Sequence, residues 1–537
     1  MTTALPYSPT VETREDAWAR LGRTTFDVLV IGGGATGAGV ARDAALRGLS
    51  TALVERDDFA SGTSSRSSRL IHGGVRYLEY GHFHLVFEAS RERRTLMRIA
   101  PHLVRPLAFT WPVYAGARVP RWKLGAGLML YDALALFRNV APHRRLRAPE
   151  VLIAEPALGA DGLVGGAQYY DAATDDARLT LATATAAAEA GAVVLNHAAV
   201  RALRHGPGGA VVGAVVQDAF GPRATQVAAR VVVNAAGPWS DTIRRLDVPT
   251  APKGVLGTKG VHIAVPAARV GNLGAVTLLS RVDGRVMFVL PAGDQTIIGT
   301  TDTATTATPD EVRATEADID YLLTSVNGCF PTAQLRRADV ISAWAGIRPL
   351  IAASAPVEPG SASREHAIER SASGVISVSG GKLTTYRSMA AETVDVVERA
   401  LGREPTLSRT DVLPLPGGGR PPDASPPHLA RAYGDRWPAV WALAEDDPDL
   451  TLPLSPGLPY IGAEAVYAAR AEMACTLSDV LLRRTHIAFE TRDAGRAAAR
   501  VVAAILAPRL DWTPEESAAQ LDRYDRDVDR IFRVDAG

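Results

Sequence analysis

A glycine-rich segment near the N-terminus has the residue types and spacing of a dinucleotide-binding turn. Gly32, Gly34 and Gly37 form a GxGxxG pattern after the apolar run Phe26 to Ile31 and before an alanine-rich helical pattern. Such glycines permit a tight turn, and the N-terminus of the following helix offers free N–H groups to a pyrophosphate. Glu55 lies eighteen residues beyond Gly37, at the end of the next apolar strand, where an acid accepts hydrogen bonds from ribose hydroxyls. Three glycines also occur in ordinary turns, but this context predicts a dinucleotide site.

Two later segments favour FAD over a nicotinamide cofactor. The sequence NAAGPW, residues 234–239, ends a strand in a small-residue turn, as in the second dinucleotide-contacting segment of many FAD proteins. The sequence VISVSGGKLTTY, residues 375–386, ends a strand in two glycines and opens a helix, whose N-terminus would stabilise negative charge on a reduced flavin. Each segment alone is compatible with a plain strand-to-helix turn, but their order along one chain predicts FAD. The cofactor candidates in these segments are Ala236, Gly237, Gly380, Gly381 and Thr384.

Three further segments are too polar for a core and carry side chains suited to anion binding and proton transfer. Residues 61–80, SGTSSRSSRLIHGGVRYLEY, combine hydroxyls and glycines with a histidine, arginines and tyrosines. The segments TKGVHIAVP and AWAGIRPL have the same character. The residues of interest in the three segments are His72, Arg76, Tyr77, Lys259, His262 and Arg348.

The elements that must position these residues alternate between strands and helices. Residues 26–55 read as one βαβ unit, which predicts a parallel sheet. A helix is expected after Asp175, followed by strands within residues 192–237 and further strands within residues 257–301. The pattern predicts an α/β fold, with a Rossmann-like FAD-binding domain into which a mainly antiparallel sheet is interleaved.

Composition divides the chain into four parts. Residues 1–25 are expected to be a loose N-terminal tail, and residues 26–408 the FAD-binding domain with its interleaved substrate-binding (cap) domain. Residues 409–427 include LPLPGGGRPPDASPP, which is too rich in proline and glycine for an element and predicts a linker. Residues 428–537 have helical periodicity and few β-branched runs, so we expect a separate C-terminal helical domain.

Charge and cysteine content exclude some partners. The chain has 537 residues, with 58 Lys plus Arg and 58 Asp plus Glu, so a nucleic-acid partner is not favoured. The two cysteines, Cys329 and Cys475, lie far apart, and no Cys/His cluster has metal-ligand spacing. We therefore expect a reduced, cytoplasmic location and no structural metal.

Membrane insertion is not expected, but contact with a membrane surface is left open. The first 25 residues contain acids and arginines and no apolar segment typical of a secretory signal, and no uncharged apolar run reaches 18 residues. The most apolar segment is Leu124 to Phe137, LGAGLMLYDALALF. It reads either as a buried helix or as an interfacial membrane helix.

At this point the sequence resembles the FAD-dependent glycerol-3-phosphate dehydrogenases and the related α-glycerophosphate oxidases. The matching stretches are IGGGATGAG, TSSRSSRLIHGGVRYLE, TDDARL, NAAGPW, KGVHIAVP, IIGTTD, GIRPL and GGKLTTYR. They run in family order over roughly residues 26–390, and EMACTLSDVLLRRT, residues 472–485, resembles the family's C-terminal domain. The family typically holds FAD, so the resemblance implies that Thr63, Ser64 and Ser65 also contact the cofactor. Because no residue stands out for covalent attachment, we expect noncovalent binding.

The resemblance implies oxidation of sn-glycerol 3-phosphate to dihydroxyacetone phosphate, with hydride passing to the flavin and electrons to a quinone. A phosphate needs fixed cations, so Arg348 and Arg76 are the phosphate candidates. Removal of the hydroxyl proton needs a base of near-neutral pKa, for which His262 and His72 are both candidates. Lys382 would polarise the flavin or the developing carbonyl. The substrate-binding candidates are Arg76, Tyr77, Arg348 and Lys382.

Several alternatives remain open from the sequence. The electron acceptor could be oxygen, giving an oxidase that releases hydrogen peroxide. An amine- or amino-acid-oxidising flavoenzyme of the same fold would place a substrate carboxylate near Arg348. A non-catalytic FAD-binding protein is disfavoured by the clustered histidines, arginines and lysine. Quinone reduction would require docking on the inner face of the plasma membrane, and a homodimer is compatible with the sequence.

Overall fold

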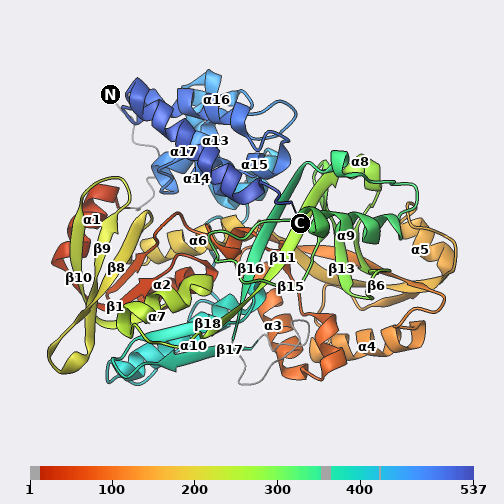
Figure 1. Cartoon of the computed structure of the whole chain (residues 1–537), viewed down its shortest axis with the longest axis horizontal. Coiled ribbons are helices and arrows are strands. Elements are labelled where there is room, and N and C mark those ends of the chain that lie inside the picture. Colours follow the sequence, from red (N-terminus) through yellow and green to blue (C-terminus); the bar gives the residue numbers. More distant parts are fainter. Residues whose placement is uncertain (1–11, 352–364, 423–424, 537) are drawn as a thin grey trace.

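The computed structural model describes residues 12–351, 365–422 and 425–536. Two sheets lie side by side, and the C-terminal helices pack against both of them (Figure 1). The strands of the two sheets alternate along the chain, because residues 70–174 and 255–351 supply one sheet while the segments around them supply the other.

The first sheet is the parallel sheet that the glycine-rich segment predicts. Its strand order is β17-β18-β10-β1-β2-β7, with parallel pairing from β18 to β7 and an antiparallel edge strand β17. Strands β8 and β9 extend from β10 as an antiparallel layer. The strands are β1 (Thr25–Ile31), β2 (Thr51–Val54), β7 (Val193–Leu195), β8 (Ala198–His205), β9 (Val211–Asp218), β10 (Ala224–Asn234), β17 (His366–Arg370) and β18 (Ile376–Gly380).

Helices cover one face of this sheet. Helices α2 (Ala35–Leu46), α6 (Asp176–Glu189) and α10 (Tyr386–Ala400) pack on it through small and branched apolar side chains such as Val40 and Val394. Burial of both faces explains why β1 and β10 read as near-continuous apolar runs instead of alternating ones.

The second sheet is large and mainly antiparallel, as the interleaved pattern predicts. Its order is β15-β11-β14-β13-β12-β4-β6-β3, with β16 paired to β11 and β5 paired to β6. The strands are β3 (Leu70–Ile71), β4 (Val104–Tyr114), β5 (Arg144–Leu146), β6 (Leu163–Thr174), β11 (Val255–Pro266), β12 (Ala275–Leu279), β13 (Val286–Ala292), β14 (Gln295–Gly299), β15 (Thr303–Ala304) and β16 (Ser342–Ile351). The predicted fold class is thereby confirmed, including the helical C-terminal region.

Alternation along β11 separates a structural face from a functional one. Val261, Ile263 and Val265 pack with helices α5 (Ala148–Ala154) and α9 (Glu316–Asn327). Since successive strand residues point to opposite faces, His262 and Ala264 point to the other side. Ala264 belongs to the apolar cluster formed with α3 (Phe83–Ile99) and α4 (Arg121–Leu134). Two short helices complete this part of the chain, α7 (Ser240–Asp247) and α8 (Ala267–Val270).

The expected loose tail is wrong for the described part of residues 1–25. Residues Arg14–Arg23 form helix α1, whose N-terminus is capped by the Thr13 side chain. Trp18 and Leu21 are buried against the sheet face that α2 leaves uncovered. The apolar positions of α1 at i and i+3 carry this contact, and the many charges around them conceal the pattern in the sequence.

The C-terminal region is helical, as predicted. Its helices are α11 (Pro427–Tyr433), α12 (Trp437–Asp446), α13 (Gly462–Ala471), α14 (Leu477–Asp479), α15 (Ile487–Glu490), α16 (Arg496–Leu506) and α17 (Pro514–Phe532). The described part of residues 409–427 has no helix or strand before Pro427, yet it is not a free linker. Leu415 is buried and donates its N–H to the carbonyl oxygen of Ile99 at 2.8 Å. The division into domains at this segment stays a prediction.

The apolar segment Leu124 to Phe137 has a buried face and an exposed one. In α4, Leu124 and Leu128 are buried, whereas Met129 is exposed and Phe137 beyond the helix is 65% exposed. The buried face agrees with the reading as a core helix, and the reading as an interfacial membrane helix stays a prediction. Across the described residues, no helix combines the length and apolar character needed to cross a membrane.

Candidate active site

A long cavity lies where the carboxyl ends of the parallel strands meet β11 and β16 of the second sheet. Open parallel sheets bind ligands at this edge. The cavity brings together residues from every segment that the sequence singled out. The predicted residues that line it are Gly32, Gly34, Glu55, Thr63, Ser64, His72, Ala236, Gly237, His262, Arg348, Gly380, Gly381, Lys382 and Thr384.

The three glycines of the GxGxxG turn have different roles. A Cβ on Gly37 would lie 1.9 Å from the carbonyl oxygen of Gly32, and a Cβ on Gly32 would lie 2.7 Å from that of Ala235. These two glycines are required by packing, and Gly37 does not line the cavity. A Cβ on Gly34 would meet only the Ser64 hydroxyl, at 3.2 Å. At Gly34 the contact is with the end of one small side chain and not with backbone, so packing restricts this position less than the other two.

Two backbone amides hold the Glu55 carboxylate beside the glycine turn. Its carboxylate accepts from the N–H of Gly33 at 2.6 Å and from the N–H of Asp57 at 2.9 Å. Burial and the negative charge of Asp57 raise the pKa of Glu55 against the opposing effect of these amides. The carboxylate is thus positioned at the end of β2 to accept from ribose hydroxyls.

The middle of the cavity is held by hydroxyls and a tight turn. Thr63 donates its hydroxyl to the carbonyl oxygen of Ile347 at 2.7 Å, which ties the segment to β16. Ser64 accepts from the N–H of Ala35 at 3.0 Å, at the N-terminus of α2. Ser65 is buried and does not line the cavity, so its prediction as a cofactor residue is not supported by its position. A 3₁₀ turn that follows Thr63 directs the Ser65 side chain inward.

The histidine end of the cavity is built on β11. The His262 ring stacks on Trp344 with 5.6 Å between ring centres and an angle of 14°. Space for the ring exists because its neighbour in β14 is Gly299, where a Cβ would lie 2.2 Å from His262. The Nε2 atom of His262 hydrogen-bonds with the Ser68 hydroxyl at 2.9 Å. Ser68 also lines the cavity, so the imidazole is oriented from both sides.

The electrostatic state of His262 differs from the expectation of a near-neutral pKa. The side chain is 3% exposed, and burial together with the positive charges of Arg348 and Arg69 lowers the pKa of His262 to about 3. A charged imidazole would lose water and face two cations. His262 is therefore neutral over the physiological pH range before substrate binds.

Arg348 enters the same end of the cavity from β16. Its guanidinium donates to the Asp302 carboxylate at 2.6 Å and to the carbonyl oxygen of Thr301 at 3.0 Å. A Cβ at Gly260, on the adjacent strand, would lie 2.8 Å from the guanidinium, so this glycine makes room for it. The side chain of Arg348 is largely buried.

The flavin-side segment after β18 adds Lys382 and Thr384. Gly380 and Gly381 have φ of 79° and 78°, which lets the chain turn from the strand into the helix. The Thr384 hydroxyl lies 3.1 Å from the backbone nitrogen of His72, which holds His72 beside this turn. The Lys382 ammonium lies 3.8 Å from the centre of the Tyr77 ring.

Two predicted substrate residues are not placed in the cavity. Tyr77 is buried behind Lys382 and does not line the cavity, so its direct contact is with the lysine. The side chain of Arg76 lies outside the described residues.

Sequence reasoning missed several residues that line or support the site. Ser68 lies within the polar segment 61–80, and Asp302 ends IIGTTD, so both were in motifs already recognised. The cavity also includes Arg66 and Trp239, which lie within recognised motifs, and residues 198–201, for which the sequence held no local signal.

We predict that Gly34→Val yields a folded protein that has lost its flavin, because the new side chain would occupy the space where a pyrophosphate approaches the backbone. Absorbance of the purified variant near the flavin bands measures the occupancy, and acid precipitation should release all flavin from the wild type. Gly37→Val is the matched comparison, and it should lower the yield of folded protein. Full flavin occupancy in the folded Gly34 variant would contradict this placement.

Comparisons with known proteins agree with this geometry. The family described as FAD dependent oxidoreductase matches residues 27–387, and the C-terminal domain of alpha-glycerophosphate oxidase matches residues 408–517. The chain is 41% identical over 531 residues to glycerol-3-phosphate dehydrogenase 2 of Mycobacterium tuberculosis (strain ATCC 25618 / H37Rv), covering 95% of this chain and 88% of that protein. It is 40% identical to glycerol-3-phosphate dehydrogenase of Synechocystis sp., covering 93% and 96%.

A solved structure extends the likeness to three dimensions. The glycerol-3-phosphate dehydrogenase from Bacillus halodurans complexed with FAD superimposes with a TM-score of 0.80 at 31% identity, covering 98% of this chain and 100% of that chain. Sequence, fold and cavity thus lead to one assignment, and the chain belongs to the family of FAD-dependent glycerol-3-phosphate dehydrogenases.

Proposed function

We propose that the protein oxidises sn-glycerol 3-phosphate at its secondary carbon to dihydroxyacetone phosphate and passes the electrons to a quinone. FAD, when bound at the glycine turn, would supply the hydride acceptor. The observation that carries the proposal is a buried, neutral imidazole and a partly buried guanidinium in the cavity that also contains the GxGxxG glycines Gly32 and Gly34. This pairing suits an anionic alcohol, since one group binds the anion and the other accepts the hydroxyl proton.

Arg348 is our phosphate ligand. Its bond to Asp302 fixes the plane of the guanidinium and so reduces the conformational entropy lost when substrate binds. Arg76 is the second phosphate candidate by its place in the 3₁₀ segment Val75–Tyr80. Because the phosphate is remote from the reacting carbon, its binding energy aligns the carbon–hydrogen bond with the flavin.

His262 is our base, with His72 as the alternative. The neutral ring is ready to accept a proton, and Nε2 is the nitrogen that faces a hydroxyl, that of Ser68. A substrate hydroxyl near this position would transfer its proton to Nε2. The dianionic phosphate would also favour the protonated ring, and would raise the pKa of His262 from its low unliganded value.

Lys382 supplies positive charge at the flavin end. It lies at the start of the segment that leads into α10, next to Gly380 and Gly381, and the Tyr77 ring limits its positions. A fixed ammonium and a helix N-terminus both favour negative charge on a reduced flavin or on the substrate oxygen.

The function is tested by adding sn-glycerol 3-phosphate to the yellow holoenzyme without oxygen. Rapid bleaching of the flavin is expected, and absence of bleaching would remove this substrate. An artificial quinone should then reoxidise the flavin much faster than oxygen does. Stoichiometric hydrogen peroxide at a comparable rate would instead favour the oxidase, and bleaching by an amino acid alone would favour the amine-oxidising alternative.

Arg348→Ala should lower kcat/KM for sn-glycerol 3-phosphate by roughly ten- to a hundredfold, the effect of losing a charge-assisted hydrogen bond of about 1.5 to 3 kcal/mol. Plain glycerol lacks the phosphate, so its slow oxidation should change little. Arg348→Lys is the matched control and should retain part of the activity, because lysine keeps the positive charge but cannot make the paired hydrogen bonds of a guanidinium. Equal losses for glycerol and its phosphate would show that Arg348 supports the fold instead of the phosphate.

His262→Ala should slow flavin reduction by roughly a hundredfold or more while binding of an unreactive phosphate analogue stays near normal. Since the pKa of the unliganded imidazole is about 3, protonation removes the base only as the pH falls towards that value. The acid limb of kcat/KM that belongs to His262 should therefore lie below about pH 5. Rapid-mixing measurements of flavin reduction across pH, on the His262→Ala and His72→Ala variants, test this prediction. It would be contradicted by an acid limb near pH 7 that is lost only in His262→Ala.

We also propose that α3 and α4 form a membrane-docking surface on a cytoplasmic protein. Trp122 is 73% exposed, and further apolar side chains of the two helices and of the residues after α4 are exposed. The two helices lie at the lower edge of Figure 1. The apolar residues of this surface are Phe83, Phe87, Trp122, Met129, Leu130, Leu136 and Phe137. The basic residues Arg121 and Arg138 are exposed among them. An exposed apolar patch with interspersed arginines fits the surface of an anionic lipid bilayer.

Replacing Trp122 and Phe137 together by Glu should reduce cosedimentation with anionic vesicles several-fold, because apolar area is lost and negative charge is added. The control is Ile153→Glu, which changes an exposed apolar residue on α5, outside the docking surface. Flavin reduction by sn-glycerol 3-phosphate should be unchanged in all three proteins. Equal vesicle binding by the double variant and the wild type would exclude this surface.

A further inference from the structure

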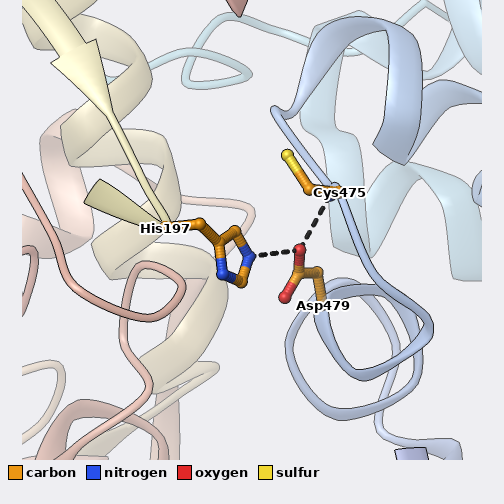
Figure 2. Close-up of side chains that lie close together, drawn as sticks. All are labelled: His197, Cys475 and Asp479. Atoms are coloured by element: carbon orange, nitrogen blue, oxygen red, sulfur yellow. Dashed lines mark hydrogen bonds and ion pairs between the residues drawn. The ribbon is translucent and has the colours of Figure 1, made fainter. Parts of the chain in front are cut away.

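Residues from two distant parts of the chain meet beside the cofactor cavity. His197 lies in the turn between β7 and β8, while Cys475 and Asp479 belong to the C-terminal helical region (Figure 2). His197 Nε2 lies 2.9 Å from the Asp479 carboxylate, and both side chains are buried. The pair joins the C-terminal region to the FAD-binding sheet.

The three residues have the chemistry of metal ligands, but the contacts of Asp479 favour another role. Its carboxylate already accepts from the backbone N–H of Cys475 at 2.7 Å, from that of Thr476 at 2.9 Å and from the guanidinium of Arg483 at 2.7 Å. Burial and the negative charge of Asp479 raise the pKa of the Cys475 thiol to about 12, which opposes formation of the thiolate that a cation would need. Asp479 therefore acts as a hydrogen-bonded anchor.

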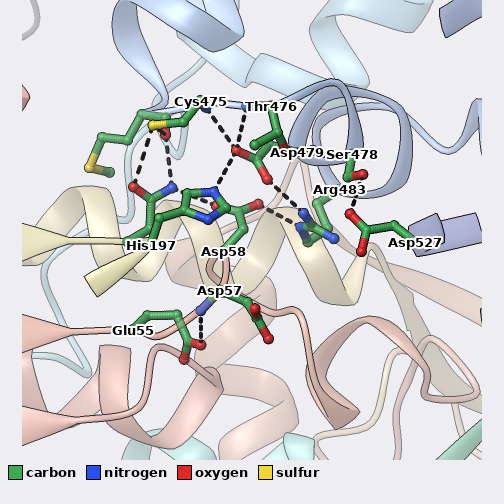
Figure 3. Close-up of polar contacts among 12 residues, drawn as sticks. Glu55, Asp57, Asp58, His197, Cys475, Thr476, Ser478, Asp479, Arg483 and Asp527 are labelled. Atoms are coloured by element: carbon green, nitrogen blue, oxygen red, sulfur yellow. Dashed lines mark hydrogen bonds and ion pairs between the residues drawn. The ribbon is translucent and has the colours of Figure 1, made fainter. Parts of the chain in front are cut away.

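A second carboxylate continues the network towards the cavity (Figure 3). Asp58 accepts from Arg483 Nε at 2.5 Å, from the Arg484 guanidinium and from the Asn196 amide at 2.9 Å. Two carboxylates and two guanidiniums balance in charge, so the buried network needs no outside ion. Burial would raise the pKa of Asp479, but His197, Arg483 and Arg484 lower it well below its usual value.

The network is attached to backbone that lines the cavity. The N–H of His197 donates to the carbonyl oxygen of Asp57 at 2.6 Å, and the N–H of Ala198 donates to that of Glu55 at 2.7 Å. Glu55 and residues 198–201 line the same part of the cavity. That part is the adenosine end, because an acid at the end of β2 accepts from the ribose of a dinucleotide.

We propose that the C-terminal segment 475–484 is a positioning part of the FAD site. Asp479 of this segment holds His197, between β7 and β8, and Arg483 holds Asp58, after β2. The segment thereby fixes the two strand ends that bind the adenosine half of FAD. The inference depends on FAD binding and is independent of the substrate, so it can fail while the proposed function stands.

Two variants test it from opposite sides of the contact. Asp479→Asn removes the charge with little change of shape. His197→Asn shortens the side chain beyond reach of Asp479, and asparagine tolerates the left-handed backbone at this position, where φ is 49°. Each should speed release of FAD from diluted holoenzyme and weaken the competing binding of ADP by roughly tenfold or more. With excess FAD, kcat and KM for sn-glycerol 3-phosphate should return to wild-type values.

Two matched controls separate positioning from general destabilisation. Glu472→Gln breaks the buried bond to Arg178, which also joins the C-terminal region to the FAD-binding part but lies away from the cavity lining. Cys475→Ser keeps the backbone N–H that Asp479 accepts. Both should release FAD at the wild-type rate. Unchanged FAD and ADP binding in both test variants, or equal losses in Glu472→Gln, would overturn the proposal, and an equal loss in Cys475→Ser would favour a cation site.

Discussion

Charged groups that are buried in this protein must be neutralised by one another, and much of the structure follows from this constraint. Removing one partner from such a pair is costly, because the remaining charge has lost its water. The pair of Arg348 and Asp302 orients a cation in the cavity, and the network of Asp58 with Arg483 and Arg484 joins the C-terminal region to the cofactor site. In both places the ion pairs hold side chains and segments in a fixed orientation, in addition to stabilising the fold.

The same constraint sets the chemistry of His262. Burial, together with the positive charges of Arg348 and Arg69, makes the protonated ring unfavourable, so the ring is neutral. If His262 is the base, as we propose, phosphate binding and proton acceptance would be coupled, because a phosphate at Arg348 would also favour a charged imidazole. This coupling would let a histidine with a pKa far below neutrality act as a base in the complete complex.

Local patterns in the sequence predicted the parts of the fold and site that local forces determine. The β1, glycine turn and α2 unit was predicted because strand, turn and helix lie consecutively, and the lining role of Gly34 follows from it. The cofactor role of Ser65 stays a prediction, since its side chain is buried outside the cavity lining while Thr63 and Ser64 of the same 3₁₀ turn line the cavity. The low pKa of His262 was beyond prediction from sequence, since it arises mainly from burial and then from the charges of Arg348 and Arg69, both distant along the chain. Helix α1 was missed because its three buried residues, Ala17, Trp18 and Leu21, lie among charges.

Helix α4 links the exposed surface to the substrate end of the cavity. Its Tyr131 accepts from the N–H of Gly73 at 2.9 Å and donates to Asp171 at 2.6 Å, in a buried group that also contains Arg93. Gly73 directly follows His72, so the loop that carries this histidine rests on the inner face of the helix whose outer face is apolar. A bilayer bound to α4 would lie on the substrate side of the molecule, away from the C-terminal network that holds the adenosine end. The two ends of the cofactor site are thus supported by different parts of the chain, and each can be altered without the other.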